Sequence, residues 1–345
     1  MKVKVSLAIM LAVVFGSAVL CPRAFCEEKK MGDEVKSALK DLKSQDVNAR
    51  INAAAKLGER QNRDPRALPD LLNALKDDNA IVRQNAADTI GNFRDKSATG
   101  PLVEALKKET DNSVKVSIIV ALNYVKDKEC IVPLVEIFQK EKTENIRINI
   151  IQLFGSFRAE QAVQELIKSL GKDKSSRIRA GSARALGFIA SPLAVKPLIK
   201  ALEDTDETVV MNAIEALGTA GDRSAAESIK PLLGSKNARL KCIAAAALGK
   251  LGSADGFAVA LGEAGNADPK VRVAAIEALG NMGKSDEAVI KAIAKALEDT
   301  DRSVVRVAET ARINLGIIPE QVAPQEQPQK EQKIQPAVKE KKQGR

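Results

Sequence analysis

Histidine and tryptophan are absent from this chain of 345 residues, tyrosine occurs once, and aromatic residues make up only 3% of it. Without histidine the chain lacks the commonest general base and the commonest metal ligand in proteins. A core with so few aromatic rings has to be built from Leu, Ile, Val and Ala, which allow helices to pack closely. The composition disfavours an enzyme, and we expect no cofactor and no metal site.

Cysteine is also scarce, and beyond the N-terminal segment only Cys130 and Cys242 remain. They are separated by several copies of the repeat described below, so no disulfide is expected between them. The net charge is +9, but part of this excess lies in the two terminal segments. The mild excess on the body of the chain does not predict nucleic-acid binding.

The N-terminus has the pattern of a secretory signal. Two lysines precede an uncharged, mostly apolar run over 5–20, which is marginal in length for a membrane span. Cleavage is predicted after Ala18 or Cys26, and a soluble product is favoured over an uncleaved anchor. A lipid anchor at Cys21 or Cys26 fits less well, because a bulky residue precedes each cysteine. We expect 1–26 to be a signal peptide and the protein to be periplasmic or extracellular.

An internal repeat of 31–33 residues runs through most of the chain and decides the fold. The copies are aligned on one position, numbered 0, which is basic in all copies but one: Arg50, Arg83, Lys115, Arg147, Arg179, Val210, Lys241 and Arg272. Position −4 carries Asp, Asn, Ser or Thr, whose side chains cap the first turn of a helix. Position +8 carries Gly in all these copies except the third, which has Asn123, and both residue types end helices in the left-handed conformation. Cap and stop predict a helix of about three turns in each copy.

The apolar residues of this helix recur at positions −1, +3, +4 and +7, which form one face at the helical period. Another apolar, periodic segment precedes most of these helices, for example at 68–75 and 195–202. Two short helices cannot bury their apolar faces alone, so successive pairs must stack. We predict an all-α fold, a right-handed α-solenoid of about nine helix pairs over 27–316. The segment 317–345, rich in Gln, Pro, Lys and Glu, has the composition of a disordered tail.

The eighth copy, Asp268–Gly280, reads DPKVRVAAIEALG. This pattern resembles the HEAT repeat in its short bacterial form, which is related to the HEAT-like repeats of bilin lyases. The resemblance covers about 33–316, and the chain departs from the pattern at Val210, at Asn123 and in the last copy, around Arg306. It implies a superhelix of helix pairs that acts as a binding scaffold.

The basic residues at position 0 form a ladder that suggests an anion-binding groove. At about 100° per residue, however, position 0 lies between positions +7 and +4, inside the apolar stripe. We therefore expect each stem to lie on the core and each charge to pair with an acidic residue of a neighbouring repeat.

The outward face of the capped helix is the predicted binding surface. It carries positions −2, +1, +2 and +5, and in most copies position +2 is Asn or Ser and position +5 is polar or charged. In the third and fourth copies this face gains the apolar residues Val116, Val120 and Ile148, which indicates either a partner contact or burial by neighbouring helices. The predicted partner-binding residues are Val116, Val120, Ile148, Asn149, Gln152, Arg184, Met211, Asn212 and Glu215.

Three classes of function follow. We expect an exported, non-enzymatic scaffold that binds a protein or peptide on this face. The alternative is a bilin-lyase-like enzyme that handles a tetrapyrrole, and it depends on the family resemblance alone. A nucleic-acid-binding solenoid is the third class, and it would require a basic stripe and more aromatic residues.

Overall fold

The computed structural model describes residues 31–322, and every regular element in this range is an α-helix or a short 3-10 turn. The helices form nine pairs. The first helices of the pairs are α1 (Asp33–Asp41), α3 (Leu68–Ala74), α5 (Thr99–Lys108), α7 (Ile131–Lys140), α9 (Val163–Lys172), α11 (Val195–Lys200), α13 (Ala226–Ile229), α15 (Phe257–Glu263) and α17 (Glu287–Leu297). The second helices are α2 (Val47–Gly58), α4 (Ala80–Phe93), α6 (Asn112–Val125), α8 (Glu144–Phe157), α10 (Ser176–Ile189), α12 (Glu207–Ala220), α14 (Ala238–Lys250), α16 (Pro269–Asn281) and α18 (Arg302–Asn314).

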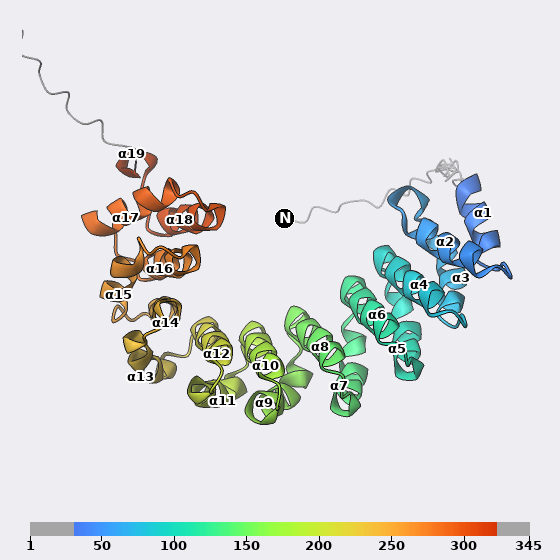
Figure 1. Ribbon diagram of the computed structural model, residues 1–345, viewed down its shortest axis with the longest axis horizontal. Coiled ribbons are helices and arrows are strands. Elements are labelled where there is room, and N and C mark those ends of the chain that lie inside the picture. Colours follow the sequence, from blue (N-terminus) through green and yellow to red (C-terminus); the bar gives the residue numbers. More distant parts are fainter. Residues whose placement is uncertain (1–30, 323–345) are drawn as a thin grey trace, which may run out of the picture.

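The pairs stack into an open arc (Figure 1). The second helices line its concave side and are called the inner helices below, whereas the first helices lie on the convex side. Each inner helix packs against the next inner helix along the chain. The predicted all-α solenoid is confirmed.

The two terminal segments are described only in part. The expected signal peptide, 1–26, lies outside the described residues, as does 323–345. The ordered structure continues past the expected boundary at residue 316. Ile317 is buried, and a short helix, α19 (Pro319–Val322), follows it.

Polar side chains cap the inner helices. The side chain at position −4 accepts a hydrogen bond from a first-turn backbone N–H in α2, α4, α6, α10, α12, α14 and α16, as predicted. Thr143 makes no such bond at the start of α8, where the prediction was wrong. There the Glu141 carboxylate accepts a hydrogen bond from the backbone N–H of Thr143, at 2.8 Å.

Only α2 ends at its +8 glycine, Gly58, and the glycines at +8 do not end the other inner helices, contrary to the prediction. Helix α10 continues past Gly187, and α12 continues past Gly218. From the second copy to the eighth the left-handed residue lies at +11 instead, and Gly316 occupies the equivalent place after α18; the set is Arg94, Lys126, Arg158, Ala190, Gly221, Gly252, Gly283 and Gly316. The first four of these are not glycine, so the repeat pattern gave no signal for the true helix end.

The glycines at +8 are needed where successive inner helices touch. A β-carbon built on Gly187 would lie 2.8 Å from the Cα atom of Ala216 on α12. One built on Gly280 would lie 2.8 Å from the Cβ atom of Ala311 on α18. Carbon atoms normally approach to about 3.5–4.0 Å. Glycine at +8 opposite alanine at +6 of the next helix therefore permits a close approach of the two backbones.

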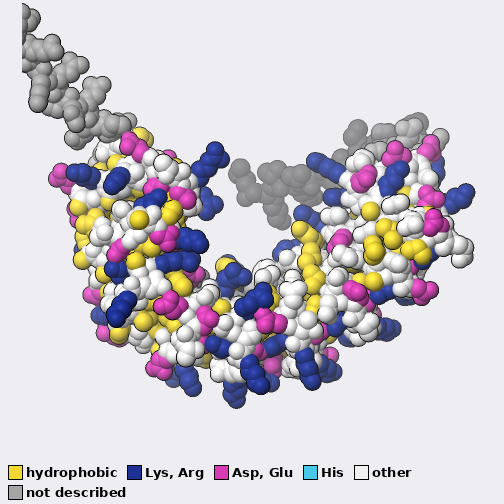
Figure 2. Space-filling model, in the orientation of Figure 1, with side chains coloured by type: hydrophobic (Ala, Val, Ile, Leu, Met, Phe, Trp, Pro, Cys, Tyr) yellow, Lys and Arg dark blue, Asp and Glu magenta, His cyan; other side chains and the backbone are white. Residues whose placement is uncertain are grey.

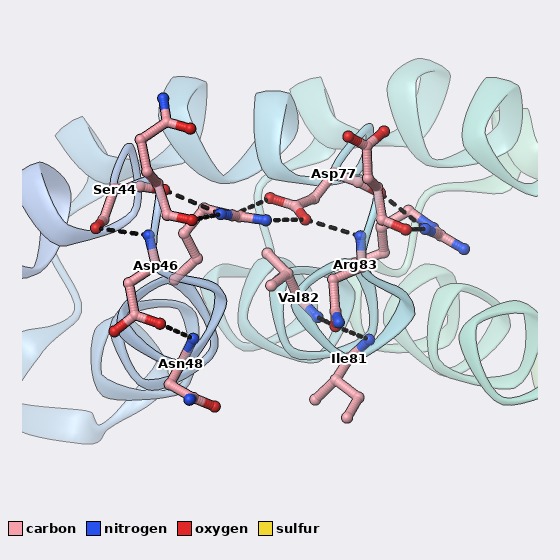
Figure 3. Close-up of polar contacts among 11 residues, drawn as sticks. Ser44, Asp46, Asn48, Asp77, Ile81, Val82 and Arg83 are labelled. Atoms are coloured by element: carbon pink, nitrogen blue, oxygen red, sulfur yellow. Dashed lines mark hydrogen bonds and ion pairs between the residues drawn. The ribbon is translucent and has the colours of Figure 1, made fainter.

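The basic ladder is part of the structural framework, as predicted. The ion pairs are Arg50–Asp77, Arg83–Glu109, Lys115–Glu141, Arg147–Asp173, Arg179–Asp204, Lys241–Glu263 and Arg272–Asp299, with N–O distances of 2.5–2.8 Å. Figure 3 shows how two successive pairs are linked: the Asp77 carboxylate accepts from Arg50, and the Arg83 side chain donates to the backbone carbonyl of Asp77 at 2.7 Å. The ladder is interrupted at Val210, where Ser235 takes the place of the carboxylate two residues before the cap.

Candidate partner-binding surface

Each inner helix presents one row of side chains to the concave side. The row consists of positions −2, +2, +5 and +9, which follow one another along one face of a helix. On α10 these residues are Arg177, Gly181, Arg184 and Phe188, whereas the opposite face is buried, with Leu186 fully enclosed. This set of positions is called the concave row below. It includes +9, which the sequence analysis placed outside the helix.

The nine predicted binding residues lie on four successive inner helices, α6, α8, α10 and α12. Val116, Val120, Ile148, Asn149, Met211 and Asn212 are half-buried, and Gln152, Arg184 and Glu215 are exposed. Val116, Ile148 and Met211 also pack against the core. Neighbouring helices therefore cover the apolar members of the set only in part.

Val116 and Val120 on α6, with Ile148 on α8, are called the apolar patch. Figure 2 shows hydrophobic side chains gathered on the concave side of the molecule over α6. The buried side chains Ile118, Ile119 and Leu122 make up the other faces of the same helix. Helix α6 is thus apolar nearly all round, and the apolar patch is the part that other helices leave accessible.

The spacing of α6 and α8 explains why the patch is accessible. At this junction Asn123 stands at position +8 in place of glycine, and Leu153 stands at +6 of the next helix in place of alanine. These larger side chains prevent the close backbone approach seen between α10 and α12, and α6 and α8 pack together less closely. The junction is held partly by a polar contact, in which Ser156 Oγ donates to Asn123 Oδ1 at 2.7 Å.

A groove of about 320 Å³ lies between α8 and α10, next to the apolar patch. Its lining includes Gln152 and Arg184 from the predicted set, with Gly181 and Phe188. The Ile148 side chain reaches the groove, because its Cδ1 atom lies 3.5 Å from the position that a β-carbon on Gly181 would occupy. Glycine at +2, where most other copies have Asn or Ser, leaves this space open.

Two exposed aromatic side chains belong to the same surface and were missed by sequence reasoning. Tyr124 on α6 and Phe188 on α10 both occupy position +9 and are 49% and 56% exposed. Each lies against a +8 glycine of the preceding inner helix, with ring carbons 3.6 Å and 3.4 Å from the β-carbon positions of Gly91 and Gly155. Positions +5 and +9 are four residues apart and therefore lie on the same helix face. This relation could have been predicted only if the helix had been extended past +8.

A second hollow, of about 250 Å³, lies over α14, where Ala246 is flanked by Glu215 of α12 and Glu277 of α16. Lys250 Nζ donates to Glu277 Oε1 at 2.7 Å. Burial, and then the charge of Glu277, raise the pKa of Glu215 above its ordinary value, against the opposing effect of nearby Lys and Arg side chains. The Glu215 carboxylate touches water, but the concave wall surrounds it with protein atoms at longer range, and this weakens its solvation.

The two cysteines of the described residues are not reactive. Cys130 and Cys242 are buried free thiols, in agreement with the expected absence of a disulfide between them. Burial, followed by a nearby carboxylate, raises the pKa of Cys130 to about 12 and that of Cys242 to about 11, so both are poor nucleophiles at neutral pH. Within 31–322 no helix is long and apolar enough to cross a membrane, and no group of His, Cys, Asp and Glu side chains is placed to hold a metal ion.

The family model for HEAT repeats matches 35–123, 131–218, 195–262 and 232–312. An engineered protein of known crystal structure is 22% identical, with a TM-score of 0.43 over 84% of this chain and 90% of that chain. The complex of CpcE and CpcF of phycocyanin lyase from Nostoc sp. PCC7120 is 22% identical, with a TM-score of 0.40 over 79% of this chain and 98% of that chain. None of the curated proteins matches. The matched repeats extend over nearly the whole solenoid, and the chain belongs to the HEAT-repeat family.

Proposed function

We propose that this protein is an exported, non-enzymatic scaffold that binds a protein or peptide segment on its concave side, over α6 to α10. The observation that carries the proposal is the apolar patch of Val116, Val120 and Ile148, which continues into the groove between α8 and α10. Export is supported by the pattern of the N-terminal sequence.

The energetics favour a partner at this surface. Fully burying a Phe or Val side chain contributes about 1.5–3 kcal/mol relative to leaving it exposed. Tyr124 and Phe188 are about half exposed, and the apolar patch is half-buried, so a covering segment gains this free energy without rearranging the core. Aromatic and aliphatic side chains surrounded by polar ones are typical of the anchor points of interfaces. Asn149 and Gln152 provide such a polar surround on α8.

The test uses the protein purified from its own host and a displayed library of random peptides. Peptides that bind it are selected, and their affinities are then measured for the variants Val120→Asp and Ile148→Asp. Each substitution is expected to abolish binding, because it places an unpaired charge in the apolar contact. Val132→Asp is the matched control: Val132 lies on α7, on the convex side, and is 56% exposed.

Helicity and melting temperature must be nearly unchanged in all three variants. If Val120→Asp or Ile148→Asp unfolds the protein, that residue is core and the apolar patch is not a binding surface. If both variants fold and still bind the selected peptides, the partner docks elsewhere. An absorption spectrum of the purified protein tests the tetrapyrrole alternative, and a bound pigment would contradict the proposal.

A further inference from the structure

Charge is divided unevenly along the concave row. From α2 to α8 the row contains no Lys or Arg, and its only charged residues are Glu59 and Asp88. From α10 to α16 it contains Arg177, Arg184, Arg239, Lys250 and Lys270, against Glu215 and Glu277. Figure 2 shows Lys and Arg side chains along the inner edge of the arm that carries α16 and α18. The concave side is therefore mildly acidic and apolar in one half and basic in the other.

Two of these five cations are paired within the fold, Arg177 with Glu144 at 2.9 Å and Lys250 with Glu277 at 2.7 Å, and the other three are not. Every basic residue at position 0 is paired with a carboxylate, whereas the side chains of Arg184, Arg239 and Lys270 form no ion pair or hydrogen bond with any described residue. Arg239 and Lys270, like Arg177, also occupy the second residue of an inner helix. A cation there opposes the helix dipole, which favours anions at the N-terminus. Glu215 attracts Arg184 and Arg239 at longer range, but no ion pair holds either of them, and the helix dipole disfavours Arg239 and Lys270 where they stand.

We propose that the segment bound on the concave side is an acidic one, with its carboxylates over α10 to α16 and its apolar side chains over α6 to α8. The inference rests on the proposed function and adds the chemistry and the direction of the partner. Free cations on a concave wall attract an acidic segment over a longer range than on a convex one, because the low-dielectric walls focus the field. The apolar patch then fixes the register of the segment.

The dimensions set the length of the segment. Adjacent packed helices lie about 8–10 Å apart, so the five steps from α6 to α16 span about 40–50 Å. An extended chain covers about 3.3 Å per residue, and about 12–15 residues bridge this distance. A library of random peptides of about 16 residues is therefore long enough to reach both halves.

The experiment selects this library on the full protein and compares the bound peptides with the input. Enrichment of peptides that combine an apolar cluster with a run of Asp or Glu is expected. Their affinity should fall about tenfold or more in Arg184→Glu/Arg239→Glu, and by less in Arg184→Gln/Arg239→Gln. Lys196→Glu/Lys200→Glu is the matched control, because both lysines are exposed on α11 of the convex side and the change in net charge is identical.

The outcomes separate this inference from the proposed function. Peptides that bind but show no excess of acidic residues, or that bind Arg184→Glu/Arg239→Glu as well as the unmodified protein, overturn the inference and leave the scaffold intact. If no peptide is enriched, the proposed function fails and the inference fails with it. A single-stranded DNA oligonucleotide is the second probe. If the protein binds it more tightly than the selected peptides, the inference of an acidic protein partner is also overturned. If the Glu variant does not fold, the Gln variant decides, because it removes both charges without reversing them.

Discussion

Two glycines of α10 should respond in opposite ways to alanine. Alanine is favoured over glycine inside a helix by about 1 kcal/mol. At Gly181 the new β-carbon would lie 3.5 Å from Ile148 Cδ1 and 3.6 Å from Ile151 Cγ2, which are ordinary contacts. Gly181→Ala should therefore stabilise the protein by about 0.5–1 kcal/mol. At Gly187 the β-carbon would lie 2.8 Å from both Cα and Cβ of Ala216, so two helix backbones must move apart.

Overpacking of this kind costs about 1–3 kcal/mol. The helix propensity is the same at both sites and cancels, so Gly187→Ala should be less stable than Gly181→Ala by about 1–3 kcal/mol. Urea unfolding followed by circular dichroism gives the difference. Hydrogen exchange in α10 and α12 adds a local measurement, because repeat proteins need not unfold as one unit. Equal stability of the two variants would refute the close-packing explanation of the +8 glycines.

Three further predictions concern the helix ends, the ladder and the N-terminus. Ala190→Gly should stabilise the protein by about 0.5–1 kcal/mol, because Ala190 has φ 57° and glycine adopts this conformation without strain. Gly221→Ala, at φ 72°, should destabilise it by a similar amount. Unchanged urea midpoints in both variants would contradict the assignment of the helix end to position +11. Burial alone would raise the pKa of Glu141, but hydrogen bonds from Lys115 and Thr143 outweigh it and lower the pKa from 4.5 to about 2. The stability contributed by the Lys115–Glu141 pair is thus complete above about pH 4.5 and is lost as the pH falls towards 2. In Glu141→Gln the urea midpoint should depend less on pH over that interval. Intact-mass analysis of the protein from its own host should show loss of the first 18 to 26 residues, and an unprocessed cytoplasmic chain would refute export.

The repeat could be predicted from the sequence because its signals are local and recur. A capping side chain such as Asp206 acts on a backbone N–H two residues away, and the Arg179–Asp204 pair follows from the position of Arg179 inside the apolar stripe. Recurrence in successive copies separates such signals from chance. The fold class, most caps and the ladder were therefore predicted correctly.

The role of the +8 glycines could not be predicted from the sequence, because it depends on a contact between repeats. Gly187 is equally consistent with a helix stop and with a close approach to Ala216, and only the structure places the two together. The error ended every predicted inner helix except the first too early. Position +9 was thereby removed from the binding surface, and Tyr124 and Phe188 were lost with it.

Two departures from the repeat, Asn123 and Gly181, lie beside the predicted binding residues, and one cause accounts for this. A residue that fits the repeat is held by its contacts with the next copy, as Gly187 is held by Ala216. Asn123 and Gly181 break that rule: one separates α6 from α8, and the other opens the groove between α8 and α10. Neither change helps the stacking of the helices, since Asn123 removes a close contact and Gly181 lowers helix propensity. Irregularities that cost stability and together expose apolar surface are more simply explained by a bound segment than by the fold.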